Sequence, residues 1–462
     1  MPNAFASLML VLWPVISVWL FVRLSPGRAL IASLVAAYLI LPPPPAGFDF
    51  PLMPPLTKET IPSLVALLAC LVLHRGRIRF LPDHPVAKAL VVIFIASPLA
   101  TVLTNMDPVY FDRHALPALR FREAIALMVN QALLITPLLL ARNFLRSDSD
   151  LKDLLWAVFL GAMIYSLPML LEVRLSPQLN IWVYGYFQHS FEQMIRDGGF
   201  RPIVFLYHGL WAAFLAMSGL LAAVTIARSE PTRRAVAWWV CAIYLMGVLV
   251  LCKSMASILY GFAFAPAIAF LTTRMQMHLA LALVLLVLAY PVLKAGDAVP
   301  EDRILELAEG VDAERANSLR FRLDNENVLM DRAMERPFFG WGSWGRNHIY
   351  DASGTILTTT DGRWIITMGV YGWVGFLAEF GLLTLPILLL WRRTTGVVSG
   401  AIPPWLGGLA LIHVINVIDL LPNATITPMT WLIAGALLGY GEEVQLARKP
   451  GPAPLRTILG GR

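Results

Sequence analysis

The chain has few cysteines and no signal-peptide pattern. Its 462 residues include only three cysteines, Cys70, Cys241 and Cys252, all in apolar stretches and without a Cys-x-x-Cys spacing. The sequence therefore indicates neither a disulfide framework nor a zinc site, and we interpret the three cysteines as small core residues. The first residues, MPNAFASLMLVLWPV, lack a basic n-region and a small-residue cleavage site, so residues 4–22 are expected to form a retained span.

Charged residues are also scarce. They make up 14% of the chain and hydrophobic residues 58%, against roughly 25% and 45–50% in soluble domains. Several apolar runs approach the roughly 20 residues that cross a bilayer. The net charge of +6 is interpreted as a mark of cytoplasmic loops and not of nucleic-acid binding. The sequence therefore predicts an all-α, polytopic integral membrane protein whose surroundings are the lipid bilayer, with no nucleic-acid partner.

The apolar runs give about 12–13 transmembrane helices, one of them a candidate re-entrant segment. The thirteen candidate spans are residues 4–22, 29–41, 60–73, 86–103, 124–140, 151–171, 202–226, 235–251, 257–271, 277–293, 365–391, 405–421 and 427–440. They divide the chain into N-terminal transmembrane helices (1–171), a first outer loop (172–201), central transmembrane helices (202–293), a large, partly helical outer loop (294–364), C-terminal transmembrane helices (365–441) and a cytoplasmic tail (442–462).

Basic clusters predict the orientation, because short cytoplasmic loops carry most Lys and Arg. The clusters in alternate connections are Arg23/Arg28, residues 74–79, Arg142/Arg146, Arg228/Arg233/Arg234, Arg274, Arg392/Arg393 and Arg448/Lys449. This places the N-terminus outside, the C-terminus inside and the two longest connections outside. One shorter outer connection, with Arg113, Arg120 and Arg122, goes against the bias.

The first outer loop ends in IRDGGFRPIVFLYHGLWAAF. Arg196 and Arg201 stand at the mouth of the next span, and His208 is expected on the same helical face as Arg201, within the first two turns. Ionisable residues at membrane depth are functional candidates by default. The alternative is that the arginines extend to lipid headgroups and His208 caps a packed polar pocket.

The second outer loop contains RFRLDNENVLMDRAMERPFFGWGSWGRNHIYD. Residues 318–335 have the spacing of an amphipathic helix that Pro337 ends, with Arg322 and Asp331 on part of one face. Gly340 and Gly342 would let the backbone approach a ligand, and Trp341 would lie at the interface or stack on a sugar. Arginine suits phosphate because its planar fork donates two parallel hydrogen bonds. Alternatively, these arginines pair with the acidic residues of the loop, so that only two or three contact a ligand.

Two of these patterns resemble a known family. Arg322, fourteen residues and then PFFGWG, followed by GVYGWVGFLAEFGLL at 369–383, resembles the signature of the O-antigen ligase and Wzy polymerase superfamily. The usual form of that signature is an Arg, a P-l-f-G-x-G turn, a His-Asn pair and a G-l-i-G span start. RDGGFRPIVFLYHG resembles the arginine-bearing segment that opens a mid-chain span in these families, so the resemblance covers roughly residues 196–383. At the place of the His-Asn pair, however, stand Asp361 and Gly362. The ligase branch relies on that histidine, so the departure favours a polymerase.

The resemblance implies a GT-C-like glycosyltransferase in the bacterial inner membrane, with periplasmic outer loops. It would transfer a glycan from undecaprenyl pyrophosphate to a sugar hydroxyl of another lipid-linked repeat, with inversion and without metal or cofactor. The implied pyrophosphate ligands are Arg196, Arg201, Arg322, Arg336, Arg346 and Arg363. The general base would be Asp361, His348 or Asp331, of which His348 is most easily tuned near neutral pH. His208, Gly340, Trp341 and Gly342 complete the implied pocket, and a chain-length regulator and a flippase are possible protein partners.

Three other interpretations stay open. An O-antigen ligase would pass the glycan to lipid A-core. A secondary transporter would carry ionisable residues in mid-span and internal repeats. Asn416, Asp419 and Asn423 give one such polar span, without a matching half elsewhere. A non-catalytic scaffold or flippase accessory is the third.

Overall fold

The computed structural model describes the chain except residues 51–53, 77, 197, 311–312, 398–399 and 444–462. Most of the expected cytoplasmic tail therefore lies outside the described residues. About 70% of the residues are helical and 3% are in strands, which confirms the predicted helical class. The helices are α1 (Ala4–Arg23), α2 (Pro26–Ile40), α3 (Thr60–Leu73), α4 (Pro85–Leu103), α5 (Phe121–Phe144), α6 (Asp148–Leu175), α7 (Leu179–Tyr184), η1 (Glu192–Met194), α8 (Gly209–Ser229), α9 (Thr232–Leu251), α10 (Met255–Phe270), α11 (Thr273–Ala295), α12 (Glu301–Glu309), α13 (Ala313–Met334), α14 (Arg363–Thr394), α15 (Pro404–Asp419) and α16 (Pro428–Glu443).

Eight helices of the described chain are long and apolar enough to cross a membrane: α1, α4, α5, α6, α8, α9, α11 and α14. This confirms a multi-pass membrane protein. The other five predicted spans are also helical, but α2, α3, α10, α15 and α16 have only 14–16 residues. At about 1.5 Å per residue each is shorter than the roughly 30 Å of a hydrocarbon core. The total of 12–13 spans stays a prediction.

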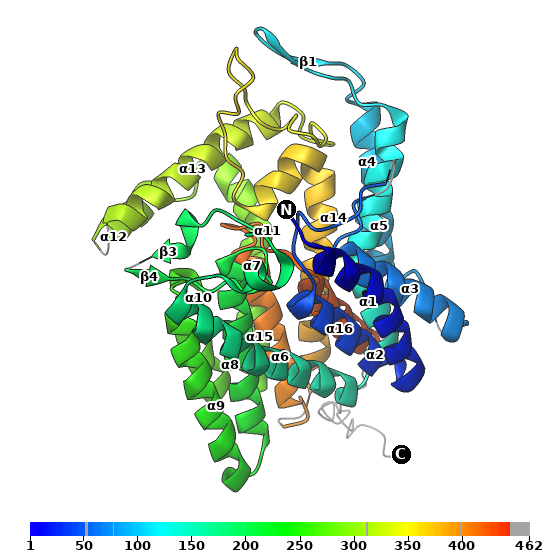
Figure 1. Cartoon of the computed structure of the whole chain (residues 1–462), viewed down its shortest axis with the longest axis vertical. Helices are drawn as coiled ribbons and strands as arrows, with labels where there is room; N and C mark the ends of the chain where they lie inside the picture. The colour runs from blue at the N-terminus through cyan, green and yellow to red at the C-terminus, as the bar shows by residue number, and fades with distance from the viewer. Residues whose placement is uncertain (51–53, 77, 197, 311–312, 398–399, 444–462) are drawn as a thin grey trace, which may run out of the picture.

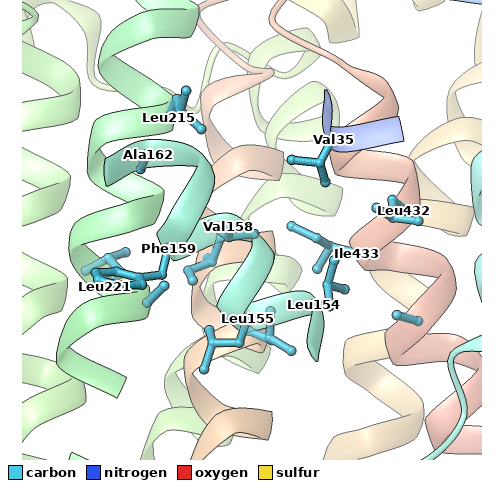
Figure 2. Close-up of a cluster of buried hydrophobic side chains, with 14 of the residues drawn as sticks. Val35, Leu154, Leu155, Val158, Phe159, Ala162, Leu215, Leu221, Leu432 and Ile433 are labelled. Carbon is cyan, nitrogen blue, oxygen red and sulfur yellow. The ribbon is translucent and has the colours of Figure 1, made fainter. Parts of the chain in front are cut away.

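Helix α8 is the most enclosed of the eight long helices in the described chain, with 89% of its most apolar window buried. It approaches α6 closely at Gly219, where an added Cβ would lie 2.1 Å from the Cβ of Ala162. Small residues of this kind let membrane helices pack backbone to backbone. Figure 2 shows the α6 face that meets α8, α2 and α16, with Leu154, Leu155, Val158, Phe159, Ala162, Leu215, Leu221, Val35, Leu432 and Ile433 labelled.

The predicted basic connections, as far as the structure describes them, gather at one end of the bundle (Figure 1). There, Arg142 Nε lies 2.6 Å from Glu442 and Arg28 Nε lies 2.7 Å from Asp153. The N-terminus lies at the opposite end (Figure 1), where Asn3 N donates to Tyr184 O in the first long connection. The alternation predicted from charge is thus present in the fold. Which end faces the cytoplasm stays a prediction.

Helix α13 confirms the predicted amphipathic helix of the second long connection, and Pro337 follows its last turn. Two short antiparallel hairpins were not predicted. Strands β1 (Val109–Phe111) and β2 (His114–Leu116) pair Tyr110 with Ala115, and β3 (Ile195–Arg196) and β4 (Gly199–Phe200) pair Arg196 with Gly199. The β3–β4 hairpin and α13 lie at the end of the bundle where α10 begins (Figure 1).

Candidate functional site

The glycine turn of residues 337–342 packs against a break in α14. Gly372, with φ 64° and ψ −164°, interrupts that helix, so neighbouring peptide groups lose their helical partners. The turn replaces them. Trp373 N donates to Pro337 O at 2.7 Å and Trp341 N donates to Gly369 O at 2.8 Å. An added Cβ at Gly340 would lie 2.5 Å from the backbone of Val370. Gly340 thus allows close approach to α14 and Gly342 close approach to Leu119, and neither lines the cavity described below.

A polar cavity of about 460 Å³ lies between the two long connections. It is bounded by residues of 189–211, by 253–256 at the start of α10, by Arg322 of α13, by 360–361 before α14 and by 423–425 after α15. Five predicted site residues meet there: Arg196, Arg201, His208, Arg322 and Asp361. Because they come from three separate segments, only the fold brings them together.

Residues 201–208 are not helical, so the expected helix from residue 202 is wrong in its first seven residues. Buried side chains bind the peptide groups of this segment in place of helical partners. Glu172 Oε2 accepts from Ile203 N at 2.8 Å and Val204 N at 2.7 Å, and Lys58 Nζ donates to Phe205 O at 2.7 Å. Irregular backbone is tolerated at membrane depth only where protein satisfies it in this way.

The bonding also holds Val204 at φ 53°, a value that β-branched residues rarely adopt. Two further side chains complete the support: Tyr165 Oη accepts from Phe205 N at 2.9 Å, and Gln188 Nε2 donates to Val204 O at 2.9 Å. Strained backbone persists where the surroundings over-determine it, often at functional sites. The segment delivers Arg201 to one side of the cavity and His208 to the start of α8.

His208 is the N-cap of α8, so the expectation that it shares a helical face with Arg201 is wrong. Its Nδ1 accepts from Leu210 N at 3.0 Å, which leaves the proton on Nε2, 3.3 Å from Gln193 Oε1. Burial lowers the pKa of His208 to about 3, with further lowering by His189 and Arg201. A neutral imidazole whose free nitrogen already accepts a hydrogen bond is a donor at this site and not a base.

Cations dominate the lining of the cavity. Among the described lining residues, Arg196, Arg201, Lys253 and Arg322 supply four cations and Asp361 supplies one carboxylate, whose Oδ2 lies 3.6 Å from Arg322 Nε. The N-termini of α8 and α10 also open onto the cavity, and helix N-termini favour anions. The arrangement is therefore suited to hold a multiply charged anion.

Sequence reasoning missed Lys253. It lies between α9 and α10 with φ 52°, and its Nζ donates to Arg196 O at 2.7 Å. A signal was present in the sequence, because a single basic residue in a very short outer connection goes against the positive-inside bias. His189 was missed too. Its ring centroid lies 4.6 Å from that of His208, and burial lowers its pKa.

The other predicted site residues lie outside the cavity. Arg346 is buried and donates to the carbonyls of Trp341, Pro117 and Asp107, so it holds the glycine turn to the connection before α5. Arg336 and Arg332 lie over the Trp341 ring, at 4.4 and 3.4 Å from its centroid. Through these contacts Arg336, Arg346 and Trp341 hold the glycine turn in position.

The remaining candidates also contact protein groups away from the cavity. Arg363 pairs with buried Glu379 at 2.7 Å, and His348 Nδ1 lies 3.0 Å from Thr358 Oγ1. Asp331 is exposed on α13. Of the three acidic or histidine candidates for a general base, Asp361 alone lines the cavity. In the part of the chain that the structure describes, no three His, Cys, Asp or Glu side chains are grouped to hold a metal ion.

Comparison with models of protein families and with curated proteins gives no match. The superfamily resemblance therefore stays a prediction, and a function for the cavity is argued from its own geometry.

Proposed function

We propose that the protein is a membrane glycosyltransferase, a polysaccharide polymerase of GT-C-like architecture that works at the periplasmic face of the bacterial inner membrane. The donor is a glycan on undecaprenyl pyrophosphate, and the acceptor is a sugar hydroxyl of another lipid-linked repeat. The observation that carries the proposal is the cavity, whose described lining combines four cationic side chains, two helix N-termini and one carboxylate within a bundle of apolar helices.

The cations supply the electrostatic part of this chemistry. The bond between the anomeric carbon and the phosphate oxygen breaks, and its electron pair leaves with the pyrophosphate. Guanidinium groups fixed in place beforehand stabilise that growing charge more in the transition state than in the bound substrate. Arg201 and Arg322 suit this role because both line the cavity and arginine forms paired hydrogen bonds to phosphate.

Asp361 supplies the acid–base part. The acceptor oxygen forms its bond to the anomeric carbon from the side opposite the pyrophosphate, and its proton passes to the Asp361 carboxylate. One displacement inverts the anomeric carbon. The assignment follows from place, because a general base must lie within hydrogen-bond reach of the attacking hydroxyl. His208 and His189 have their Nδ1 acceptors occupied by the backbone N–H groups of Leu210 and Ser190.

Arg322→Lys tests the proposal, with Arg320→Lys as its matched control. Both residues lie on α13, but the Arg320 side chain is 51% exposed and pairs with Glu309 at 2.9 Å, away from the cavity. The purified proteins are incubated with undecaprenyl pyrophosphate-linked oligosaccharide, and longer lipid-linked products are resolved on a gel. We expect Arg322→Lys and Arg201→Lys to lose at least about tenfold in product, because lysine keeps the charge but loses the paired hydrogen bonds. The Arg320→Lys protein should make product normally.

The same assay separates the alternatives. Equal product from the Arg322→Lys and Arg320→Lys proteins would contradict phosphate recognition at Arg322. A wild-type protein that does not elongate the lipid-linked oligosaccharide but moves a solute across vesicle membranes would favour a transporter. Product that appears only when lipid A-core is added would favour a ligase.

A further inference from the structure

A buried carboxylate lies directly behind one wall of the cavity. Asp419, the last residue of α15, is 0% exposed and belongs to the polar span that also holds Asn416 and Asn423. Its Oδ1 accepts from Asn423 Nδ2 at 2.9 Å and its Oδ2 accepts from Thr425 Oγ1 at 2.8 Å. Asn423 and Thr425 both line the cavity, whereas Asp419 does not reach it. The carboxylate is thus placed to control how its two neighbours face a ligand.

Hydrogen-bond chemistry fixes the direction of both contacts. An ionised carboxylate can only accept, so Asn423 must turn its NH₂ group and Thr425 its hydroxyl proton toward Asp419. The Asn423 Oδ1 atom then points away from Asp419, and it lies 3.5 Å from Arg322 Nη1 at the edge of the cavity. The lone pairs of Thr425 Oγ1 are likewise left for the cavity side. Asp419 therefore makes both side chains present acceptors.

The described lining of the cavity consequently offers two chemically different sets of groups. Arg196, Arg201 and Lys253 supply donors that suit phosphate oxygens, which only accept. Asn423 and Thr425 supply acceptors, which suit groups that donate. A volume of about 460 Å³ is within the range of roughly 300–1,000 Å³ typical of small-molecule sites. A ligand that satisfies both sets has an anionic part next to a part rich in hydroxyl groups.

We propose that Asn423 and Thr425, oriented by Asp419, form a subsite for the hydroxyl groups of the sugar ring attached directly to the pyrophosphate. The inference rests on the proposed function and adds specificity-determining residues to it. Asn423 and Thr425 contact the sugar, and Asp419 is a positioning residue that acts through them. The subsite distinguishes a lipid pyrophosphate that carries a sugar from the same lipid pyrophosphate without one, which is the product left after transfer.

Binding of two probes to the full chain in lipid nanodiscs tests this subsite. The probes are undecaprenyl pyrophosphate and the same lipid carrying a single hexose or N-acetylhexosamine. Thr425→Val is nearly isosteric and removes only the hydroxyl. We expect it to weaken binding of at least one sugar-bearing probe by roughly three- to tenfold, the worth of a neutral hydrogen bond, and to leave the bare lipid unchanged.

Two further variants sharpen the test. Asp419→Asn can no longer accept at both oxygens, so Asn423 or Thr425 must reverse its direction, and the same selective loss is expected. Thr427→Val is the matched control, because Thr427 is also buried in this segment but its Oγ1 faces Thr430 Oγ1 at 3.3 Å and does not line the cavity. It should bind both probes as the wild type does.

The two probes separate failure of the inference from failure of the proposed function. If the wild type binds neither probe, the proposed function is wrong. If the wild type binds the bare lipid and every sugar-bearing probe equally, the sugar subsite is wrong while the pyrophosphate site stands. The same holds if the Thr425→Val and Asp419→Asn proteins lose affinity for both probes alike, or for neither.

Discussion

Substitution of Gly372 by alanine should destabilise the protein without touching the cavity. This glycine breaks α14 with φ 64° and ψ −164°, a region that is essentially open only to glycine. An added Cβ would lie 2.4 Å from Pro337 O and 2.5 Å from the carbonyl carbon and oxygen of Phe338. All three atoms are backbone, so no side chain can turn away to make room.

The expected cost comes from the backbone conformation and from the hydrogen bonds across the break. Holding alanine in this conformation costs about 1–3 kcal/mol. Moving the turn away weakens the bonds from Trp373 N to Pro337 O at 2.7 Å and from Val374 N to Phe338 O at 3.2 Å, each worth about 1 kcal/mol. A total of about 3–5 kcal/mol is a large fraction of the roughly 5–15 kcal/mol that stabilises a typical folded protein.

Thermal unfolding of the purified protein in detergent measures this cost, together with its abundance in the membrane. Gly372→Ala should lower the melting temperature by several degrees. The control is Gly247→Ala in α9, where an added Cβ meets no heavy atom within 4 Å. That protein should melt at or slightly above the wild-type temperature, because alanine favours a helix over glycine by about 1 kcal/mol. Equal melting temperatures for Gly372→Ala and the wild type would refute the close packing of turn and broken helix.

Four further outcomes are expected. Asp361→Asn should lower turnover by roughly 10²-fold or more while donor binding stays within about twofold; equal loss of both would assign Asp361 to ordering its loop. Glu172→Gln removes the carboxylate that accepts from the peptide groups of the 201–208 segment and should weaken donor binding. Glu172→Asp should weaken it too, because its carboxylate is one methylene short of those groups; unchanged binding in the Gln variant would contradict the positioning role. His208, with a pKa of about 3 against 6.5 for an ordinary imidazole, stays neutral where the unfolded chain gains a proton. The free energy of unfolding should therefore fall as pH drops from about 6.5 towards 3 and be fully kept above that window, and His208→Asn should flatten this slope in acid titrations followed by fluorescence. A cysteine at Ser353 should react with an impermeant thiol reagent from outside and one at Ser229 should not; the reverse pattern would invert the topology.

Local sequence determined the elements that depend on local chemistry. Runs of apolar residues predicted all thirteen apolar helices, because a peptide group in lipid must find its partner within its own helix. The spacing of apolar residues predicted α13, and the alternation of basic clusters predicted which connections share an end of the bundle. Five residues of the cavity were also predicted. Arg196, Arg201 and His208 followed from ionisable groups at the mouth of a span, and Arg322 and Asp361 from the superfamily resemblance.

Tertiary structure decided what depends on partners far along the chain. Nothing within residues 201–208 shows that Glu172 and Lys58 will bind their peptide groups and keep α8 from starting early. The sequence predicts a ligand contact for the glycine turn, but its partner is the broken backbone at Gly372. That break lies about thirty residues away and frees its hydrogen-bonding groups only in the fold. The sequence does not distinguish the arginines, yet Arg322 lines the cavity while Arg346 donates its hydrogen bonds to backbone carbonyls. A side chain's charge is a property of its sequence, but which groups satisfy that charge is set only when distant segments come into hydrogen-bonding range.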